Sequence, residues 1–373
     1  MVRVFERVSD NLKMQSSNID YLPRLDHLRG VAALLVFTYH LYHHFYHNWQ
    51  PNPEAWYLGL VVEGHTGVGL FFVLSGFVFM LIRLKAGEIC YFSFMRNRFL
   101  RIFPLFLFVF FVAISIGRNE FRAADVFYLF FSNLGLAPTS GSFITGAAWT
   151  ISVEFTFYAI FPFLALATVN KGVGYLPRLI LIVLLFKIGA YFISASPKHM
   201  YYSTLLGRVD QFLIGMLTAI AYQYCKERGG FKGKIWLPAA IFLVWGGVGV
   251  MAAKFSYQSA LQHDPWWVIW PSVEALLWAC VIITYLCSSI ALPLLFSRSL
   301  ELMGQVSYSW YLMHALVLWL WSQVVGPLEV ASSFAPNFLL NLLVVGILSL
   351  ALAKMSYHTL EEPFLGLRKR YVK

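Results

Sequence analysis

Charged residues are scarce in this sequence of 373 residues, where Asp, Glu, Lys and Arg make up 12% and hydrophobic residues make up 59%. Soluble domains contain about 25% charged residues, so the composition excludes an ordinary soluble domain. Inside a bilayer the backbone must satisfy its own hydrogen bonds, and a helix does so within one segment. The sequence therefore predicts an all-α, polytopic protein embedded in a lipid bilayer.

Cysteine is also rare. The four cysteines have neither the paired spacing of a zinc site nor the pattern of an extracellular disulfide framework, and no metal site is predicted. Residues 1–26 lack the apolar stretch of a cleavable signal peptide, and no internal repeat or appended soluble domain is visible. We expect a cytosolic tail over residues 1–26, a membrane domain over 27–364 and a basic cytosolic tail over 365–373.

Long apolar runs, by contrast, are frequent. A helix needs about 20 residues to cross about 30 Å of hydrocarbon. Ten segments meet this requirement, which predicts ten transmembrane helices with both termini in the cytoplasm. They lie near residues 27–48, 66–84, 102–117, 148–169, 177–195, 203–224, 235–252, 267–288, 304–324 and 335–356.

One further apolar stretch, residues 124–138, is broken by Asn133, Gly135 and Pro138 and is predicted to be a re-entrant or interfacial segment. Lys and Arg accumulate in cytoplasmic loops, and an eleventh span would put the basic loop around Lys232 outside, which favours ten. The net charge of +10 is then mostly a signal of topology. Nucleic acid is not an expected partner.

Several ionisable side chains fall inside the predicted spans, where they are costly and mark function or a buried pair. At a rise of about 1.5 Å per residue, His40 and Glu154 both lie about 10 Å below the outer boundary. Asp210 and Glu274 belong to the same outer half, and Ser75 lies a little deeper. We expect an acidic layer at the depth of His40.

A second polar group lies at the cytosolic edge. Asp26 and Arg29 fall on the same helix face as His40, because their spacing in sequence returns to nearly the same angle. On the third predicted span, Arg98 and Arg101 lie one helical turn apart, an arrangement that holds a phosphate or pyrophosphate with forked donors. The sequence thus predicts an anion site below an imidazole.

Structural alternatives exist for these residues. Arginines at span ends often serve as positive-inside anchors. Glu154 has an alternative as the ion-pair partner of Lys187, which would hold the bundle together. His40 has an alternative as a satisfied core histidine, or as a metal ligand together with His44 and His47. The glycines in the motif GVGLFFVLSGF have an alternative role in close helix packing.

Longer motifs point to a known family. The stretch RLDHLRGVAALLVFTYH has an arginine and a histidine separated by ten residues. It is followed in order by GVGLFFVLSGFVF, FMRNRFLRIFPLF, WTISVEFTFYAIFP, GQVSYSWYLMH and EEPF. Together these motifs resemble the acyltransferase-3 superfamily, integral-membrane enzymes that move acyl groups from acyl-CoA to carbohydrates or related acceptors. The resemblance extends from about Arg24 to Phe364.

The resemblance implies a ten-helix core, a cytosolic acyl-CoA donor that is expected to be acetyl-CoA, and a carbohydrate or glycolipid acceptor. A bacterial inner membrane is the expected location. In this sequence the family's histidine, its paired arginine, its two-arginine motif, its tryptophan and its glutamate are matched by His40, Arg29, Arg98, Arg101, Trp149 and Glu154.

Residue pattern and resemblance together give one hypothesis. The arginines bind the CoA phosphates, the pantetheine arm extends between the helices, and His40 removes a proton from the acceptor hydroxyl as it attacks the thioester. An acyl-histidine intermediate is the alternative mechanism. The expected catalytic group is His40, Glu154 and Asp26, the donor-binding group is Arg29, Arg98 and Arg101, and the acceptor-binding group is Trp149, Ser75, Tyr308 and Glu274.

Two other classes of function were weighed against this one. A transporter for lipid-linked sugars or protons also places charges at mid-membrane, but it predicts inverted repeats, which the sequence lacks. A histidine-based metal or haem protein is the third class. The sequence does not specify the acyl chain, the acceptor hydroxyl or the oligomeric state.

Overall fold

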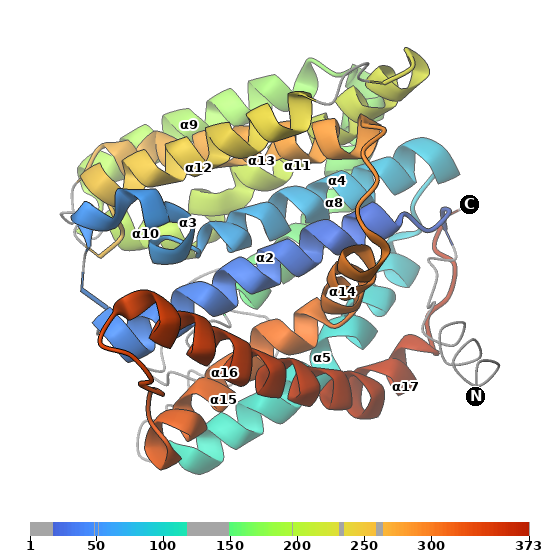
Figure 1. Ribbon diagram of the computed structural model, residues 1–373. Helices are drawn as coiled ribbons and strands as arrows, with labels where there is room; N and C mark the ends of the chain where they lie inside the picture. The colour runs from blue at the N-terminus through green and yellow to red at the C-terminus, as the bar shows by residue number, and fades with distance from the viewer. Residues whose placement is uncertain are drawn as a thin grey trace.

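The computed structural model describes residues 18–47, 49–50, 52–117, 149–195, 197–230, 235–258 and 264–372. Over these ranges the chain is mostly helical (Figure 1), and its one β-bridge joins Ile89 to Val372. The long helices are α2 (Pro23–Tyr42), α4 (Thr66–Ala86), α5 (Tyr91–Ile116), α8 (Trp149–Lys171), α9 (Tyr175–Ile193), α11 (Leu205–Glu227), α12 (Trp236–Lys254), α13 (Trp266–Cys287), α15 (Ser307–Val324) and α16 (Phe334–Ser356).

Short elements connect the long helices. They are the π-helix η1 (His43–His47), the 3-10 helix η2 (Pro53–Leu58), α3 (Gly59–Val62), α10 (Pro197–Ser203), α14 (Leu294–Gln305), the π-helix η3 (Tyr357–Glu361) and α17 (Glu362–Leu365).

Eight helices in the described part of the chain are long and apolar enough to cross a membrane. The two remaining long helices are α2, which contains two arginines, an aspartate and two histidines, and α15, which contains a histidine and several serines. Each of the ten predicted spans coincides with one long helix. The prediction of an all-α, multi-pass integral membrane protein is confirmed, whereas the placement of the termini in the cytoplasm stays a prediction.

Two helices begin at least one helical turn earlier than predicted. Helix α5 begins at Tyr91 rather than near residue 102, because the polar residues that precede its apolar run are also helical. Helix α2 begins at Pro23, a position where the missing N–H of proline costs no helical hydrogen bond. The predicted re-entrant segment, residues 124–138, lies outside the described residues.

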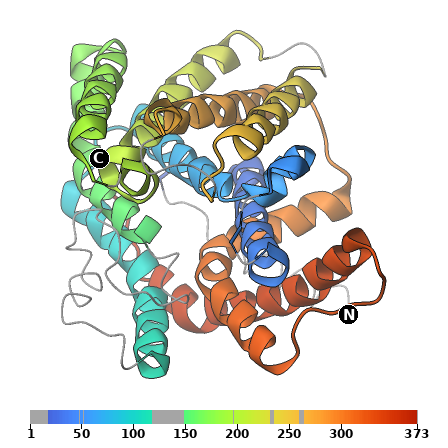
Figure 2. The same ribbon diagram turned by 90° about the vertical axis from the view of Figure 1, so that its left-hand side faces the viewer.

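Helix α2 lies at the centre of the molecule. It packs mainly against α14, α4 and α15. Figure 1 shows it crossing between one group that contains α4, α11 and α13 and a second group that contains α15 and α16, and Figure 2 shows the same arrangement from the side. Side chains on different faces of α2 therefore reach both groups of helices.

Glycines allow α4 and α11 to approach each other closely. A Cβ atom added to Gly76 would lie 2.1 Å from the carbonyl oxygen of Phe212, and one added to Gly215 would lie 2.2 Å from that of Val73. No side chain fits at such distances, and small residues serve this purpose in membrane helix pairs. The packing role considered for the glycines of GVGLFFVLSGF therefore holds at Gly76.

Arg24 fastens the start of α2 to the end of α13. Its guanidinium donates hydrogen bonds to the carbonyl oxygens of Tyr285 at 2.6 Å, Ser288 at 2.7 Å and Ile290 at 2.8 Å. The last carbonyls of a helix have no partner within the helix, and a cationic side chain can satisfy them. Arg24 is thus engaged in structure and leaves the binding of an anion to other arginines.

Candidate active site

A polar cavity lies between α2, α4, α5, α8 and α15. Glu154 of α8 and Ser75 of α4 both line it, and the Ser75 hydroxyl donates a hydrogen bond of 2.6 Å to Glu154 Oε1. Tyr308 also lines this cavity and donates a hydrogen bond of 2.7 Å to the carbonyl oxygen of Ile102. Three residues singled out from the sequence, Glu154, Ser75 and Tyr308, therefore meet in one polar cavity.

Trp149 lies behind the wall of the polar cavity. It is buried and is not a lining residue itself, and its ring centroid is 5.2 Å from that of Tyr202 and 6.2 Å from that of Phe72, which lines the cavity. The next residue, Thr150, does line the cavity and donates a hydrogen bond of 3.0 Å to the hydroxyl of Tyr311. The position of Trp149 indicates support of this wall, and its predicted contact with an acceptor stays a prediction.

Three arginines connect the polar cavity to a second hollow. Arg29 of α2 and Arg98 and Arg101 of α5 line both, so the two spaces share a boundary. Arg29 donates a hydrogen bond of 3.0 Å to Asp26, which also lines the second hollow. We call this second space the arginine hollow. The sequence prediction had placed these three arginines at one membrane edge, and the structure brings them together.

The carboxylate of Asp26 is held by two donors. Besides Arg29, the hydroxyl of Tyr21 donates a hydrogen bond of 2.6 Å to Asp26 Oδ2. Burial and the neighbouring Asp26 carboxylate raise the pKa of Tyr21, so this hydroxyl keeps its proton. Asp26 therefore orients Arg29 at the rim of the arginine hollow, far along α2 from His40, and a direct part in proton transfer has no support from its position.

A fourth arginine, Arg368, enters the arginine hollow from the segment after α17. The side-chain amide of Asn97 donates a hydrogen bond of 2.6 Å to the carbonyl oxygen of Lys369 and accepts one of 3.1 Å from its N–H, which fastens this segment to α5. Burial, together with the charges of Arg101 and Arg98, lowers the pKa of Arg368. Such crowding of positive charge is relieved by a bound anion.

Arg368 was missed in the sequence. Its surroundings, GLRKRY, are basic and were interpreted only as a topological signal. The contact that brings it to the site joins residues 272 apart in sequence, and no local pattern reveals such a contact.

His40 lies in the last turn of α2, outside the lining of the polar cavity. Its Nδ1 atom is 2.8 Å from the carbonyl oxygen of Val36. Since a carbonyl oxygen only accepts, Nδ1 carries a proton, and the lone pair of the neutral ring is at Nε2. Glu154, which was predicted to belong to the same catalytic group as His40, is hydrogen-bonded to Ser75, and the imidazole of His40 is held by the Val36 carbonyl.

A second imidazole, that of His314 on α15, lies beside His40 with the ring centroids 4.8 Å apart. His314 is 1% exposed. His314 was not among the predicted site residues, although the sequence carries a signal for it: the motif GQVSYSWYLMH ends on this histidine inside a predicted span, where an ionisable residue is unusual.

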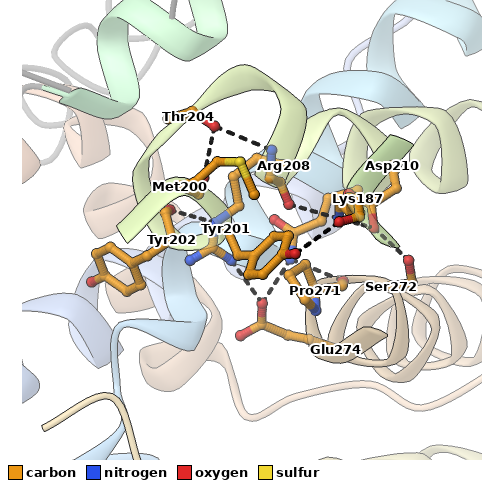
Figure 3. A network of polar contacts seen from close by, with 12 residues as sticks. Lys187, Met200, Tyr201, Tyr202, Thr204, Arg208, Asp210, Pro271, Ser272 and Glu274 are labelled. Carbon is orange, nitrogen blue, oxygen red and sulfur yellow. Dashed lines mark hydrogen bonds and ion pairs between the residues drawn. The ribbon is translucent and has the colours of Figure 1, made fainter. Parts of the chain in front are cut away.

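Three further ionisable residues of the predicted spans, Lys187, Asp210 and Glu274, belong to a network between α9, α11 and α13, away from the polar cavity (Figure 3). Lys187 donates hydrogen bonds to Asp210 at 2.8 Å and to the carbonyl oxygen of Gly207 at 2.9 Å. The alternative in which Lys187 pairs with Glu154 is therefore wrong. Depth along a helix was estimated from the sequence, but the direction in which a side chain points was not.

Glu274 belongs to the same network (Figure 3). Its Oε2 atom accepts hydrogen bonds from Arg208 at 3.2 Å and from Gln211 at 2.7 Å, and the residue is 1% exposed. It does not line the polar cavity. Its position indicates that it holds α11 to α13, in place of the contact with an acceptor that the sequence analysis assigned to it.

The Lys187–Asp210 pair is expected to stabilise the bundle without taking part in function. In a Lys187→Met variant the buried Asp210 carboxylate loses its counter-charge, which is expected to lower the free energy of unfolding by about 3–5 kcal/mol. The double variant Lys187→Met/Asp210→Leu should regain most of this loss. Thermal unfolding of the purified proteins in detergent measures both, and a single variant as stable as the unmodified protein would contradict the assignment.

No group of three or more His, Cys, Asp and Glu residues in the described ranges could hold a metal ion. The metal site considered from the sequence includes His47, whose side chain lies outside the described residues. The arrangement that is described has a cluster of guanidinium groups at one end, a carboxylate and hydroxyl groups in a cavity next to it, and a pair of imidazoles. Such a site can bind a phosphorylated ligand and transfer protons.

Comparison with known proteins gives consistent matches. The profile of a family described as "Acyltransferase domain" matches residues 22–356. A Bacillus subtilis protein named "Putative peptidoglycan O-acetyltransferase YrhL" is 28% identical over 374 residues, which cover 92% of this chain and 55% of that protein. "O-acetyltransferase OatA" of Staphylococcus aureus is 24% identical over 330 residues, which cover 79% of this chain and 50% of that protein.

A third relative matches a shorter region. "Acyltransferase MdmB" of Streptomyces mycarofaciens is 31% identical over 152 residues, 38% of each chain. This chain spans about half the length of YrhL and OatA. No solved structure matches.

Proposed function

This chain belongs to the acyltransferase family whose profile covers residues 22–356, and we propose that it is a membrane O-acyltransferase. In this proposal an acyl group, expected to be acetyl, moves from acyl-CoA to a hydroxyl of a carbohydrate or glycolipid. The expected location is a bacterial inner membrane. The names of YrhL and OatA describe O-acetyltransferases, which supports the type of reaction.

The arginine hollow supports the choice of acyl-CoA as donor. CoA carries several phosphate groups, and forked guanidinium groups bind phosphates with two parallel hydrogen bonds each. Arg98, Arg101 and Arg368 gather there, and within the described ranges no carboxylate lies in ion-pair distance of any of them. Arg29 adds a fourth guanidinium that Asp26 holds in place.

The connection between the two spaces is the observation that carries the proposal. Arg29, Arg98 and Arg101 line both the arginine hollow and the polar cavity. A donor whose phosphates bind to these side chains therefore extends its narrow pantetheine arm toward Ser75, Glu154 and Tyr311. A cluster of arginines that served only as positive-inside anchors would not need to line a cavity inside the bundle.

His40 is proposed as the general base. Its Nε2 lone pair accepts the proton of the acceptor hydroxyl while the hydroxyl oxygen attacks the thioester carbonyl, and the C–S bond then breaks to release CoA. Attack of Nε2 itself on the thioester, which would form an acyl-histidine, is the alternative order of steps. Glu154 and Ser75, fixed to each other in the polar cavity, are proposed to hold the acyl end of the donor or an acceptor hydroxyl.

A carbohydrate acceptor is supported by the family and by the printed name of YrhL, which specifies peptidoglycan. The test uses the purified full chain in lipid nanodiscs with acetyl-, succinyl- or butyryl-CoA and a soluble N-acetylglucosamine oligomer. We expect thiol release that depends on the oligomer, together with an acylated oligomer in the mass spectrum. If no donor releases thiol and none binds to the protein, the proposal is wrong.

Arg368 provides a separate test of the donor site. An Arg368→Ala variant is expected to bind acetyl-CoA about tenfold more weakly, because one charge-assisted hydrogen bond contributes about 1.5–3 kcal/mol and exposure at the hollow reduces this. Calorimetric titration measures the change. The matched control is Arg370→Ala, a change two residues away in the same segment at an exposed side chain that does not line the hollow. Equal losses in both variants would remove Arg368 from the donor site.

A further inference from the structure

We propose that His314 is a second proton-transfer group of the reaction: His40 takes the proton from the acceptor hydroxyl, and His314 delivers it to the departing CoA thiolate. This inference rests on the proposed function and adds a residue and a direction of proton movement to it. It starts from the contact between the two imidazoles, whose planes are inclined by 58°.

The two rings are held in the same way. Nδ1 of His40 lies 2.8 Å from the carbonyl oxygen of Val36, and Nδ1 of His314 lies 3.1 Å from that of Trp310, in each case four residues earlier in the helix. Both Nδ1 atoms are therefore donors, and both neutral rings have their lone pair at Nε2. Two neighbouring histidines on different helices thus each have Nε2 as their proton acceptor.

Nε2 of His314 is buried and has no hydrogen-bond partner in the described part of the chain. Burial of a polar atom without a partner is unfavourable, and buried polar atoms are almost always satisfied in proteins. If this side chain only filled the core between α2 and α15, an apolar residue could do the same without burying an unsatisfied nitrogen atom. The unpartnered Nε2 therefore indicates an atom that acquires its partner during the reaction.

The positions of the two rings assign them to different sides. The ring of His314 is 6.0 Å from that of Tyr311, which lines the polar cavity where the donor is proposed to lie. His40 contacts Trp49, whose ring centroid is 5.8 Å away and which is 38% exposed. His314 is thus the imidazole on the donor side, and His40 is the one on the more open side.

Other titratable groups face this pair without neutralising it. Tyr39 of α2 packs edge-on against His40, and its ring also contacts His43 of η1 at 4.7 Å and His65, which precedes α4, at 5.3 Å. The buried carboxylate of Glu63 accepts a hydrogen bond of 2.8 Å from His65. Two imidazoles in contact cannot both carry a positive charge at low cost. The pair therefore holds at most one proton in addition to the two on the Nδ1 atoms.

The proton balance of the step is complete. The acceptor O–H proton moves to Nε2 of His40 as the new C–O bond forms. No direct hydrogen bond joins the two rings, so the proton reaches Nε2 of His314 through a relaying water molecule between them. When the C–S bond breaks, the electron pair stays on sulfur, and the thiolate takes the proton from His314. Both imidazoles return to their starting state, and no other reactant is required.

The test compares His314→Asn with the unmodified full chain in nanodiscs, with acetyl-CoA and the N-acetylglucosamine oligomer. Asparagine keeps a donor for the Trp310 carbonyl but cannot carry the proton. We expect kcat to fall about a hundredfold at neutral pH with an unchanged Kd for CoA. The loss should grow as the pH rises from 6 to 9, because solvent protons that can replace His314 become scarcer.

A second donor distinguishes protonation of the leaving group from a structural effect. Phenyl thioacetate releases a weakly basic thiolate that leaves without a proton, so the loss caused by His314→Asn should be much smaller with this donor. A loss that is the same at every pH, or the same with both donors, would overturn the proposal. His199→Asn, at an exposed position on α10, is the control and should leave every rate unchanged. Should the Asn variant not fold, His314→Gln permits the same comparison.

Failure of this inference is distinguishable from failure of the proposed function. If the unmodified protein transfers acyl groups and His314→Asn lowers the rate equally at every pH and with both donors, the O-acyltransferase proposal stands and the role of His314 is wrong. If the unmodified protein transfers no acyl group from any donor, the proposed function itself is wrong, and the proton route falls with it.

Discussion

Replacement of His40 by alanine is expected to lower acyl transfer by about 10²–10⁴-fold, the usual contribution of a general base, and to leave the Kd for CoA nearly unchanged. The reason is that His40 and the proposed CoA-binding arginines lie apart. His40 contacts Tyr39, Trp49 and His314, whereas the arginine hollow lies at the other end of α2. Initial rates of thiol release and a calorimetric titration with CoA measure the two quantities.

The control for this variant is His199→Ala, which removes an imidazole from an exposed position on α10 and should change neither quantity. Transfer at the native rate by the His40→Ala protein would refute the assignment of His40. Intact-protein mass spectrometry without acceptor separates the two mechanisms. An acyl adduct that forms on the unmodified protein and is absent from the variant favours an acyl-histidine over a general base.

Simultaneous replacement of Arg98 and Arg101 by alanine is expected to weaken CoA binding by about 10²–10⁴-fold. Each charge-assisted hydrogen bond to a phosphate contributes about 1.5–3 kcal/mol, and every 1.4 kcal/mol is a factor of ten in Kd. The rate at saturating donor should fall much less, because neither guanidinium contacts His40 or His314. Titration with CoA at two salt concentrations measures the binding, and the unmodified protein should show the stronger dependence on salt.

Arg96→Ala is the matched control for this pair. Arg96 lies on the same helix, is exposed, and donates a hydrogen bond of 3.1 Å to the carbonyl oxygen of Leu367. It does not line either space, so its removal should change the Kd less than twofold. Arg98 also packs over the ring of Phe79 at 5.1 Å, and thermal unfolding therefore has to accompany the titration. A Kd of the double variant equal to that of Arg96→Ala would exclude the arginine hollow as the donor site.

Much of the fold was predictable from the sequence, because a membrane span leaves a strong local signal. Each long apolar run became one helix, and the polar residues inside those runs were visible as exceptions. The meeting of Arg29 with Arg98 and Arg101 was predictable for a similar reason. All three occur at span ends that the positive-inside rule assigns to one side.

The direction of a side chain around its helix was not predictable. Glu154 and Glu274 were assigned to the same outer half of the membrane, yet Glu154 points into the polar cavity and Glu274 into an ion pair with Arg208. The choice between them depends on which neighbouring helix each side chain faces, because α8 and α13 share several neighbours but only α8 packs against α5 and only α13 against α12. The pairing of Lys187 with Asp210 rests on the same kind of information, namely the adjacency of α9 and α11.

The two long helices that are not apolar enough to count as membrane spans by themselves, α2 and α15, carry both imidazoles, and this has a consequence for biosynthesis. Polar residues make the insertion of a helix into the membrane less favourable, so these two helices are expected to partition less readily by themselves than the other eight. They are held in the bilayer by the helices that surround them. Substitution of their polar residues by leucine would ease insertion and remove the proposed chemistry, a conflict between stability and activity that falls on these two helices.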